Sequence, residues 1–107
     1  MWALHAALLA EEVVPTVPAP VLAEAWRGGS RQASLVRLLA MCEVEEMTES
    51  QAKQVGVLVG RSGHTNVVDV AVVEGAIRRG DGIVTSDRRD IESVADAAGI
   101  RISIATI

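Results

Sequence analysis

Apolar residues recur along the chain at two spacings, one typical of helices and one typical of strands. Leu35 and Leu38 lie about one helical turn apart, whereas Ile100, Ile102 and Ile104 alternate as in a strand with one buried face. The pattern predicts helices at residues 2–12, 19–29, 30–41, 48–60, 67–80 and 86–99. It predicts strands at residues 42–47, 82–85 and 100–107, with a short extended piece at 13–17.

Residues that favour helix ends support these boundaries. Thr48 opens a T-E-S-Q stretch typical of a capping box, and Ser30 can cap the helix that follows it. Pro20 lies near a predicted helix start, while Gly80 and Gly99 follow the last apolar residues of two helices. The helix boundaries therefore follow from short-range signals.

Short strands that alternate with helices predict a single α/β domain with a mainly parallel sheet over residues 1–107. In such sheets, functional crevices lie beyond the carboxyl ends of the strands. The segment after Val84 is at such an end, so we expect functional residues there.

Composition narrows the class of protein. The chain has 107 residues, 50% of them apolar and only 2% aromatic, and a formal charge of -4. Stacking on bases and a uniformly basic nucleic-acid surface are therefore disfavoured, which leaves a local arginine patch. Arginine makes up nine of the ten basic residues, a pattern that suits phosphate contacts but that a GC-rich coding bias explains more simply.

Cysteine usage and hydropathy predict the location of the chain. Cys42 is the single cysteine, so we expect neither a disulfide framework nor a thiolate metal site. The apolar opening stretch lacks a basic leader, and no later run is long enough to cross a bilayer. We therefore expect a soluble, cytoplasmic protein that does not enter a membrane.

Acidic residues interrupt apolar segments in three places. Asp69 divides V-V-D-V-A-V-V, where an unpaired carboxylate beside apolar surface is costly. A helix cap explains it equally well, with Asn66 as N-cap and Asp69 in the first turn. Glu24 stands among apolar neighbours, although a solvated helix face is its simpler explanation.

Asp87 and Asp90 follow the predicted strand at 82–85, and a capped helix start at Thr85 or Ser86 would account for one of them. That cap does not explain why acids also interrupt the other two apolar segments. If Glu24, Asp69 and Asp87 meet at one sheet edge, their repulsion requires raised pKa values or a cation. Carboxylate oxygens without nearby His or Cys ligands favour Mg²⁺ or Mn²⁺, ions that support phosphodiester hydrolysis.

Three stretches together resemble the PIN domain, and within it the VapC-like ribonuclease toxins of toxin-antitoxin pairs. They are V-P-A-P-V-L-A-E-A-W-R-G-G (17–29), N-V-V-D-V-A-V-V (66–73) and I-V-T-S-D-R-R-D-I (83–91). The resemblance extends over essentially the whole chain and implies a three-layer α/β/α sandwich with a mainly parallel sheet.

The resemblance also assigns residues to a Mg²⁺ or Mn²⁺ site. Glu24, Asp69 and Asp87 match metal ligands and, with Asp90 as an accessory acid, the catalytic set. Thr85 and Ser86 match the small hydroxyl residues near the metal-bound water. Arg27, Arg88 and Arg89 are the candidates for contact with RNA phosphates, although a surface arginine before a glycine cap explains Arg27 equally well.

The chain departs from the family pattern at its start. PIN domains open with a central strand that ends in an aspartate ligand, and this sequence begins at what is predicted to be the following helix. The expectation is therefore a domain that lacks its first strand, through a misplaced start, a shortened chain or a real truncation. His64, in the link at 61–66, is interpreted as an ordinary loop residue.

The resulting prediction is a metal-dependent endoribonuclease that forms a homodimer and has an antitoxin protein as a partner. The alternative is a non-catalytic PIN-like protein that binds an antitoxin-like partner or itself through an incomplete sheet. A response-regulator-like module is a weaker alternative, because no glycine-rich phosphate loop follows a strand.

Overall fold

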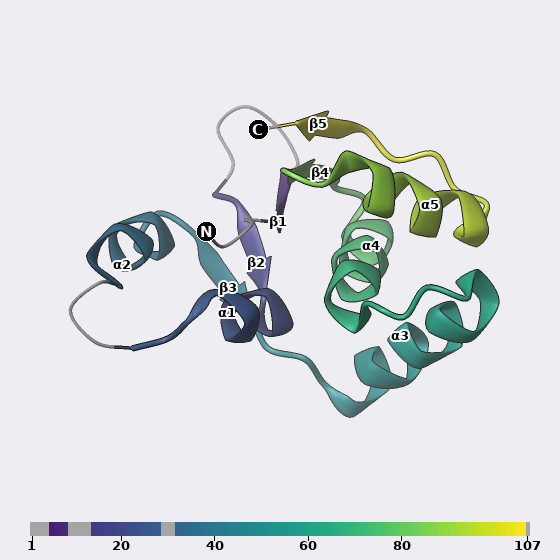
Figure 1. The fold of residues 1–107 in the computed structure, drawn as a ribbon, viewed down its shortest axis with the longest axis horizontal. Coiled ribbons are helices and arrows are strands. Elements are labelled where there is room, and N and C mark those ends of the chain that lie inside the picture. The colour runs from purple at the N-terminus through teal and green to yellow at the C-terminus, as the bar shows by residue number, and fades with distance from the viewer. Residues whose placement is uncertain (1–4, 9–13, 29–31, 107) are drawn as a thin grey trace.

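The computed structural model describes residues 5–8, 14–28 and 32–106, and side chains from residue 14 onward (Figure 1). These residues form a mixed α/β domain of five strands and five helices. The strands are β1 (His5–Leu8), β2 (Thr16–Pro18), β3 (Glu43–Glu45), β4 (Gly82–Thr85) and β5 (Ile104–Thr106). The helices are α1 (Ala19–Ala25), α2 (Ala33–Leu39), α3 (Glu49–Ser62), α4 (Val67–Arg79) and α5 (Arg88–Ala98).

The strands form one sheet in the order β3-β2-β1-β4-β5. The outer pairs, β2 with β3 and β4 with β5, are parallel, while β1 runs antiparallel to both of its neighbours. The four strands other than β1 therefore run in one direction and their carboxyl ends share one edge. The predicted parallel sheet is correct for these four strands and wrong for the central one.

The central strand corrects the prediction of a helix at residues 2–12. Residues 5–8 are extended and pair with all of β4, from His5 opposite Thr85 to Leu8 opposite Gly82. Ala and Leu favour helices, but such propensities amount to only tenths of a kcal/mol per residue and tertiary contacts override them. The middle of the sheet, where the sequence predicted a missing strand, is thus occupied by β1. The Leu4 and Leu9 positions of the predicted helix lie outside the described residues.

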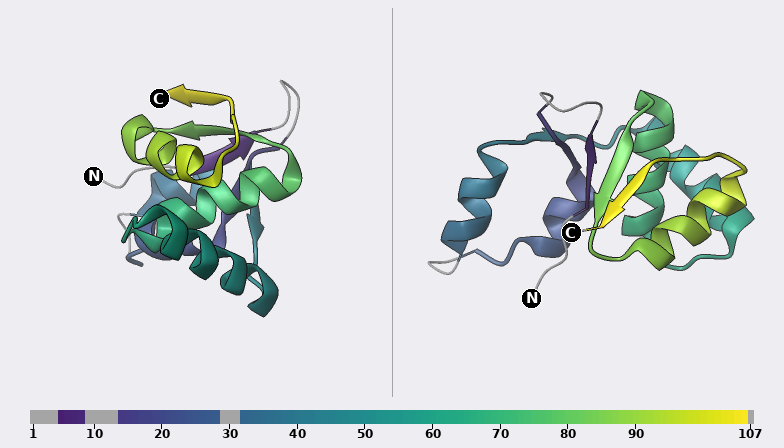
Figure 2. Two further views of the ribbon diagram at one scale, coloured as in Figure 1. Left: turned by 90° about the vertical axis from the view of Figure 1, so that its right-hand side faces the viewer. Right: turned by 90° about the horizontal axis from the view of Figure 1, so that it is seen from above.

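Helix α4 lies at the centre of the core. Val70, Val72, Val73 and Ala76 are fully buried, because α4 packs against β1 and β4 on one side and against α3 and α5 on the other. Figure 2 shows α3, α4 and α5 grouped on one side of the strands, with α2 on the opposite side. Other elements cover most faces of this helix. That coverage explains why apolar residues occupy nearly every position of the V-V-D-V-A-V-V run.

Most local predictions of helix ends are confirmed. Thr48 and Gln51 form the capping box of α3, and Gly80 and Gly99 end α4 and α5 in the left-handed conformation. Helix α1 ends at Ala25, earlier than the predicted glycine stop. The strand at 82–85 has the predicted bounds, α3 continues two residues beyond the predicted end at 60, and α2, β3 and β5 are shorter than predicted. The proposed cap at residue 30 lies outside the described residues.

None of the helices in the described parts of the chain has the length and apolar character needed to cross a bilayer.

Candidate metal site

The end of β4 forms a tight turn into α5. Thr85, the last residue of the strand, is completely buried, and its Oγ1 accepts a hydrogen bond of 3.0 Å from the backbone N–H of Asp87. Asp87 is the N-cap residue of α5, a position predicted for Thr85 or Ser86. Ser86 is exposed. The turn places the first turn of α5 beside the first turn of α4, where donor atoms of Asp90 and Asp69 lie within 4.8 Å of each other.

Asp69 lies in the first turn of α4. Asn66 caps this helix: its Oδ1 accepts hydrogen bonds from the backbone N–H groups of Val68 (3.0 Å) and Asp69 (3.2 Å). The Asp69 residue is only 2% exposed. Both explanations of Asp69 are therefore correct in part, because the residue belongs to a capped first turn and its carboxylate is buried.

His64 stands in the link between α3 and α4, and its side chain is 17% exposed. Its backbone N–H donates to Ser62 Oγ at 3.1 Å, and the backbone N–H of Asn66 donates to its Nδ1 at 3.3 Å. These local hydrogen bonds orient the ring so that Nε2 faces Asp90 Oδ1 at 3.8 Å.

One donor atom from each of His64, Asp69 and Asp90 lies within 4.8 Å of the other two. This spacing is close to that of ligands around one ion, since donors at about 2.1 Å from a divalent cation are some 3–4 Å apart. The donor set, two carboxylates and an imidazole, is one that divalent cations bind. The group can therefore accommodate a metal ion after small side-chain movements.

The predicted and observed groups differ. Asp69 and Asp90 come together, but among the described residues the group with converging donor atoms contains neither Glu24 nor Asp87. Glu24 is exposed on α1, and Asp87 is half-buried at the start of α5. Asp90, assigned as an accessory acid, is therefore the predicted residue that shares this group with Asp69.

The predicted RNA-binding arginines have different surroundings. Arg88 pairs with Glu92 and donates to the backbone carbonyl of Ile104 at 2.8 Å, so it ties α5 to β5. Arg27 donates to the carbonyl of Trp26 at 2.8 Å. Arg89 is exposed and makes no ion pair with the other described residues. Unlike Arg27 and Arg88, it makes no side-chain hydrogen bond with the described residues that a phosphate would have to replace.

Sequence reasoning missed His64 as a member of this group. A single histidine in a polar link carries little information by itself. The available signal was its distance along the chain: His64 precedes the N-cap Asn66 by two residues and Asp69 by five. A side chain so close to the start of α4 must lie near the first turn of that helix.

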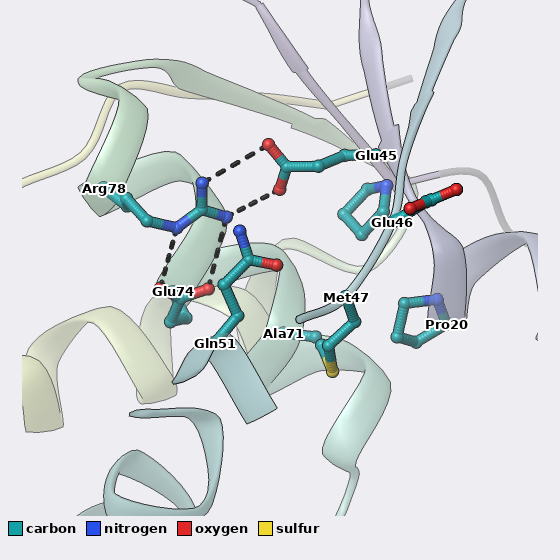
Figure 3. Close-up of a pocket in the computed structure, with 9 residues that line it drawn as sticks. Pro20, Glu45, Glu46, Met47, Gln51, Ala71, Glu74 and Arg78 are labelled. Atoms are coloured by element: carbon teal, nitrogen blue, oxygen red, sulfur yellow. Dashed lines mark hydrogen bonds and ion pairs between the residues drawn. The ribbon is translucent and has the colours of Figure 1, made fainter. Parts of the chain in front are cut away.

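A second group of charged residues lies at the other end of α4 (Figure 3). Arg78 Nη2 contacts Glu45 Oε1 at 2.6 Å and Arg78 Nε contacts Glu74 Oε2 at 3.1 Å. Arg79 contacts Glu45 and Asp81, each at 2.8 Å. Gly75 makes room for this group, because a Cβ there would stand 2.9 Å from the Arg79 guanidinium.

These ion pairs change the protonation equilibria of their members. Hydrogen bonding from Arg78 is the main cause that lowers the pKa of Glu45, and the same bond raises the pKa of Arg78. A small hollow lies beside these ion pairs and is lined by Pro20, Met47 and Gln51 among others. The volume that the centre of a water molecule can occupy there is about 10 Å³. That is room for roughly one water, so this group is a structural clasp between β3 and α4.

Comparison of the chain with protein-family models and with curated proteins found no match.

Proposed function

We propose that this protein is a divalent-metal-dependent endoribonuclease of the PIN and VapC type, using Mg²⁺ or Mn²⁺. The observation that carries the proposal is the convergence of Asp69, Asp90 and His64 within 4.8 Å. The group lies beside the turn that follows β4, the edge at which parallel α/β sheets place their sites. A buried aspartate at such an edge is a functional candidate because burial of a carboxylate is costly.

The position of each residue determines its proposed role in binding the metal ion or the RNA. Asp69 is buried and held by the first turn of α4, so it is the rigid ligand, whereas Asp90, with a side chain 47% exposed, faces the solvent side of the site. A divalent ion bound here would lower the pKa of a coordinated water and offset charge on a phosphodiester. Arg89 lies one residue before Asp90 and is the candidate to hold the RNA phosphate.

Two assigned residues require a finer proposal. Asp87 precedes α5 and is three residues from Asp90, so it can join the ligand set through a coordinated water. Glu24 belongs to α1, which packs against both β2 and α4, and it would contribute only if RNA or metal draws it in. We rank the four acids Asp69, Asp90, Asp87 and Glu24 in decreasing contribution.

A PIN-like sheet is part of the same proposal. Its support is the strand order, which places β1 between β2 and β4. The direction of β1 departs from the family, and the residue of β1 opposite Thr85 is His5 where the family has an aspartate ligand. The metal site proposed here accordingly depends on fewer carboxylates.

The test is cleavage of RNA with Mn²⁺ by the wild type, Asp69→Asn and Asp90→Asn. Each substitution keeps the side-chain shape and removes the charge, so we expect cleavage to fall by at least about 100-fold. Asp96→Asn is the matched control, because Asp96 is exposed on the same helix as Asp90. Cleavage that needs no Mn²⁺, or that persists in Asp69→Asn, contradicts the proposal.

A second candidate is a non-catalytic protein that binds an antitoxin-like partner or a second copy of itself. The edge strand β3 favours it, because Val44 is 40% exposed there and an uncovered edge can pair with another strand. This candidate predicts a stable complex and no loss of function in Asp69→Asn. The RNA-cleavage assay together with sedimentation of Asp69→Asn separates the two, because only the second candidate predicts no metal-dependent cleavage and a complex that this substitution leaves intact.

A further inference from the structure

The hydrogen bonds of His64 define which ring nitrogen carries hydrogen. Nδ1 accepts the backbone N–H of Asn66 at 3.3 Å, and a nitrogen that accepts a hydrogen bond carries no proton. In the neutral ring the hydrogen is therefore on Nε2, the atom that faces Asp90 Oδ1 at 3.8 Å. His64 thus presents an N–H to the site and not a lone pair.

This arrangement does not suit direct ligation by His64. A neutral imidazole that binds a metal through Nε2 must carry its hydrogen on Nδ1, and it usually donates that hydrogen to an acceptor. Here Nδ1 meets a donor, the Asn66 N–H, so ligation would cost this hydrogen bond. The N–H on Nε2 instead meets a carboxylate, the group to which it can donate.

We propose that His64 is a positioning residue, whose Nε2–H directs Asp90 toward Asp69 so that the two carboxylates bind the ion. The inference rests on the proposed function, which supplies the metal. The present 3.8 Å separation is longer than a hydrogen bond and closes by a small movement of Asp90 or through one bridging water. Groups that orient metal ligands in this way typically contribute about 10–100-fold to metal affinity.

The link at 62–66 explains how His64 can hold this orientation. Ser62 Oγ accepts the backbone N–H of His64 and lies 3.4 Å from the carbonyl of Val59, to which it donates. Asn66 in turn caps α4 and so positions Asp69. One run of local hydrogen bonds therefore sets both the imidazole and the buried carboxylate.

Two substitutions separate the local role of His64 from its role toward Asp90. In His64→Asn, the amide oxygen lies near the place of Nδ1 and can accept the Asn66 N–H, but no donor reaches Asp90. In His64→Gln, the longer amide can place an N–H near the position of Nε2. His64→Asn therefore keeps only the contact with Asn66, and His64→Gln keeps only the contact with Asp90.

The experiment is calorimetric titration of the full chain with Mn²⁺, without RNA. We expect His64→Asn to lose about 10–100-fold in Mn²⁺ affinity and His64→Gln to stay within about threefold of wild type. Thr65→Ala, a change at an exposed neighbour, is the control and should bind as wild type does. Circular dichroism of each sample establishes that it is folded.

Three results would overturn the inference. Wild-type affinity in His64→Asn with a loss in His64→Gln assigns His64 a purely structural role. A loss in both variants, together with nitrogen coupling in the Mn²⁺ electron spin echo spectrum of the wild type, makes His64 a direct ligand. Absence of Mn²⁺ binding by the wild type also overturns it. RNA cleavage is measured separately: a protein that binds Mn²⁺ as expected but cuts no RNA refutes the ribonuclease proposal and leaves the role of His64 standing.

Discussion

The two ends of α4 carry acidic groups that are arranged in opposite ways. At the carboxyl end, Arg78 and Arg79 contact Glu45, Glu74 and Asp81 at 2.6–3.1 Å. At the amino end, the donor atoms of His64, Asp69 and Asp90 are spread over as much as 4.8 Å. The first group is held together by direct ion pairs, whereas the donor atoms of the second are somewhat farther apart than ligands around one ion.

The helix dipole suits both arrangements. The amino end of a helix favours negative charge such as Asp69, and the carboxyl end favours the cations of Arg78 and Arg79. The comparison shows that an acidic group is not a metal site merely because it is acidic. Guanidinium groups pair with the carboxylates of one group, whereas the donor atoms of the other lie within 4.8 Å of one another, which is near the spacing of metal ligands.

The largest expected effect comes from adding the ion. Mn²⁺ at about 100 times its dissociation constant should stabilise the wild type by about 2.7 kcal/mol, because it binds only the folded state. Asp69→Asn should lose this increment and Glu45→Gln should keep it. Urea unfolding with and without Mn²⁺ measures it. If Mn²⁺ stabilises Asp69→Asn as much as the wild type, the ion binds elsewhere, and the proposed difference between the two ends of α4 is wrong.

The next largest effect comes from removing the ion pairs of Arg78 at the carboxyl end of α4. Arg78→Met should lower the free energy of unfolding by about 2 kcal/mol, because Glu74 loses its ion pair and Glu45 keeps its contact with Arg79 but loses the one with Arg78. The side chain is 34% exposed, so the loss should be smaller than for a fully buried pair. Urea unfolding checks the value, and Arg89→Met, at an exposed position of α5, should change it by less than about 0.5 kcal/mol. The Mn²⁺ increment should be unaffected.

The smallest effect depends on pH. The folded state lowers the pKa of Glu45 below its ordinary value of 4.5, so its stabilisation is fully present above that value and is lost as pH falls through the lowered pKa. Glu45→Gln should cost about 1 kcal/mol at neutral pH, and the difference from wild type should shrink in acid. Urea unfolding across this range measures it. Glu43→Gln, at an exposed position of the same strand, should show no such trend; a pH-independent difference would mean that shape and not charge matters at Glu45.

Predictions from the sequence were best where the interactions are local. The capping box at Thr48, the cap at Asn66 and the strand at 82–85 all have their partners within a few residues or a continuous apolar run. The same signals located Asp69 in the first turn of a covered helix. Its membership of a site depended on Asp90, which comes from another helix.

The sequence by itself determined the order of the elements from β2 onward, the buried character of α4 and the placement of acids at its start. Only the tertiary structure decided that residues 5–8 form the central strand, that Glu24 is not in the group of His64, Asp69 and Asp90, and that Glu45 meets Arg78 across 33 positions of the chain. The reason is physical. Caps and apolar faces depend on neighbours within a turn, whereas strand pairing and ion pairing depend on which distant backbone lies opposite, and local propensities of tenths of a kcal/mol cannot specify that.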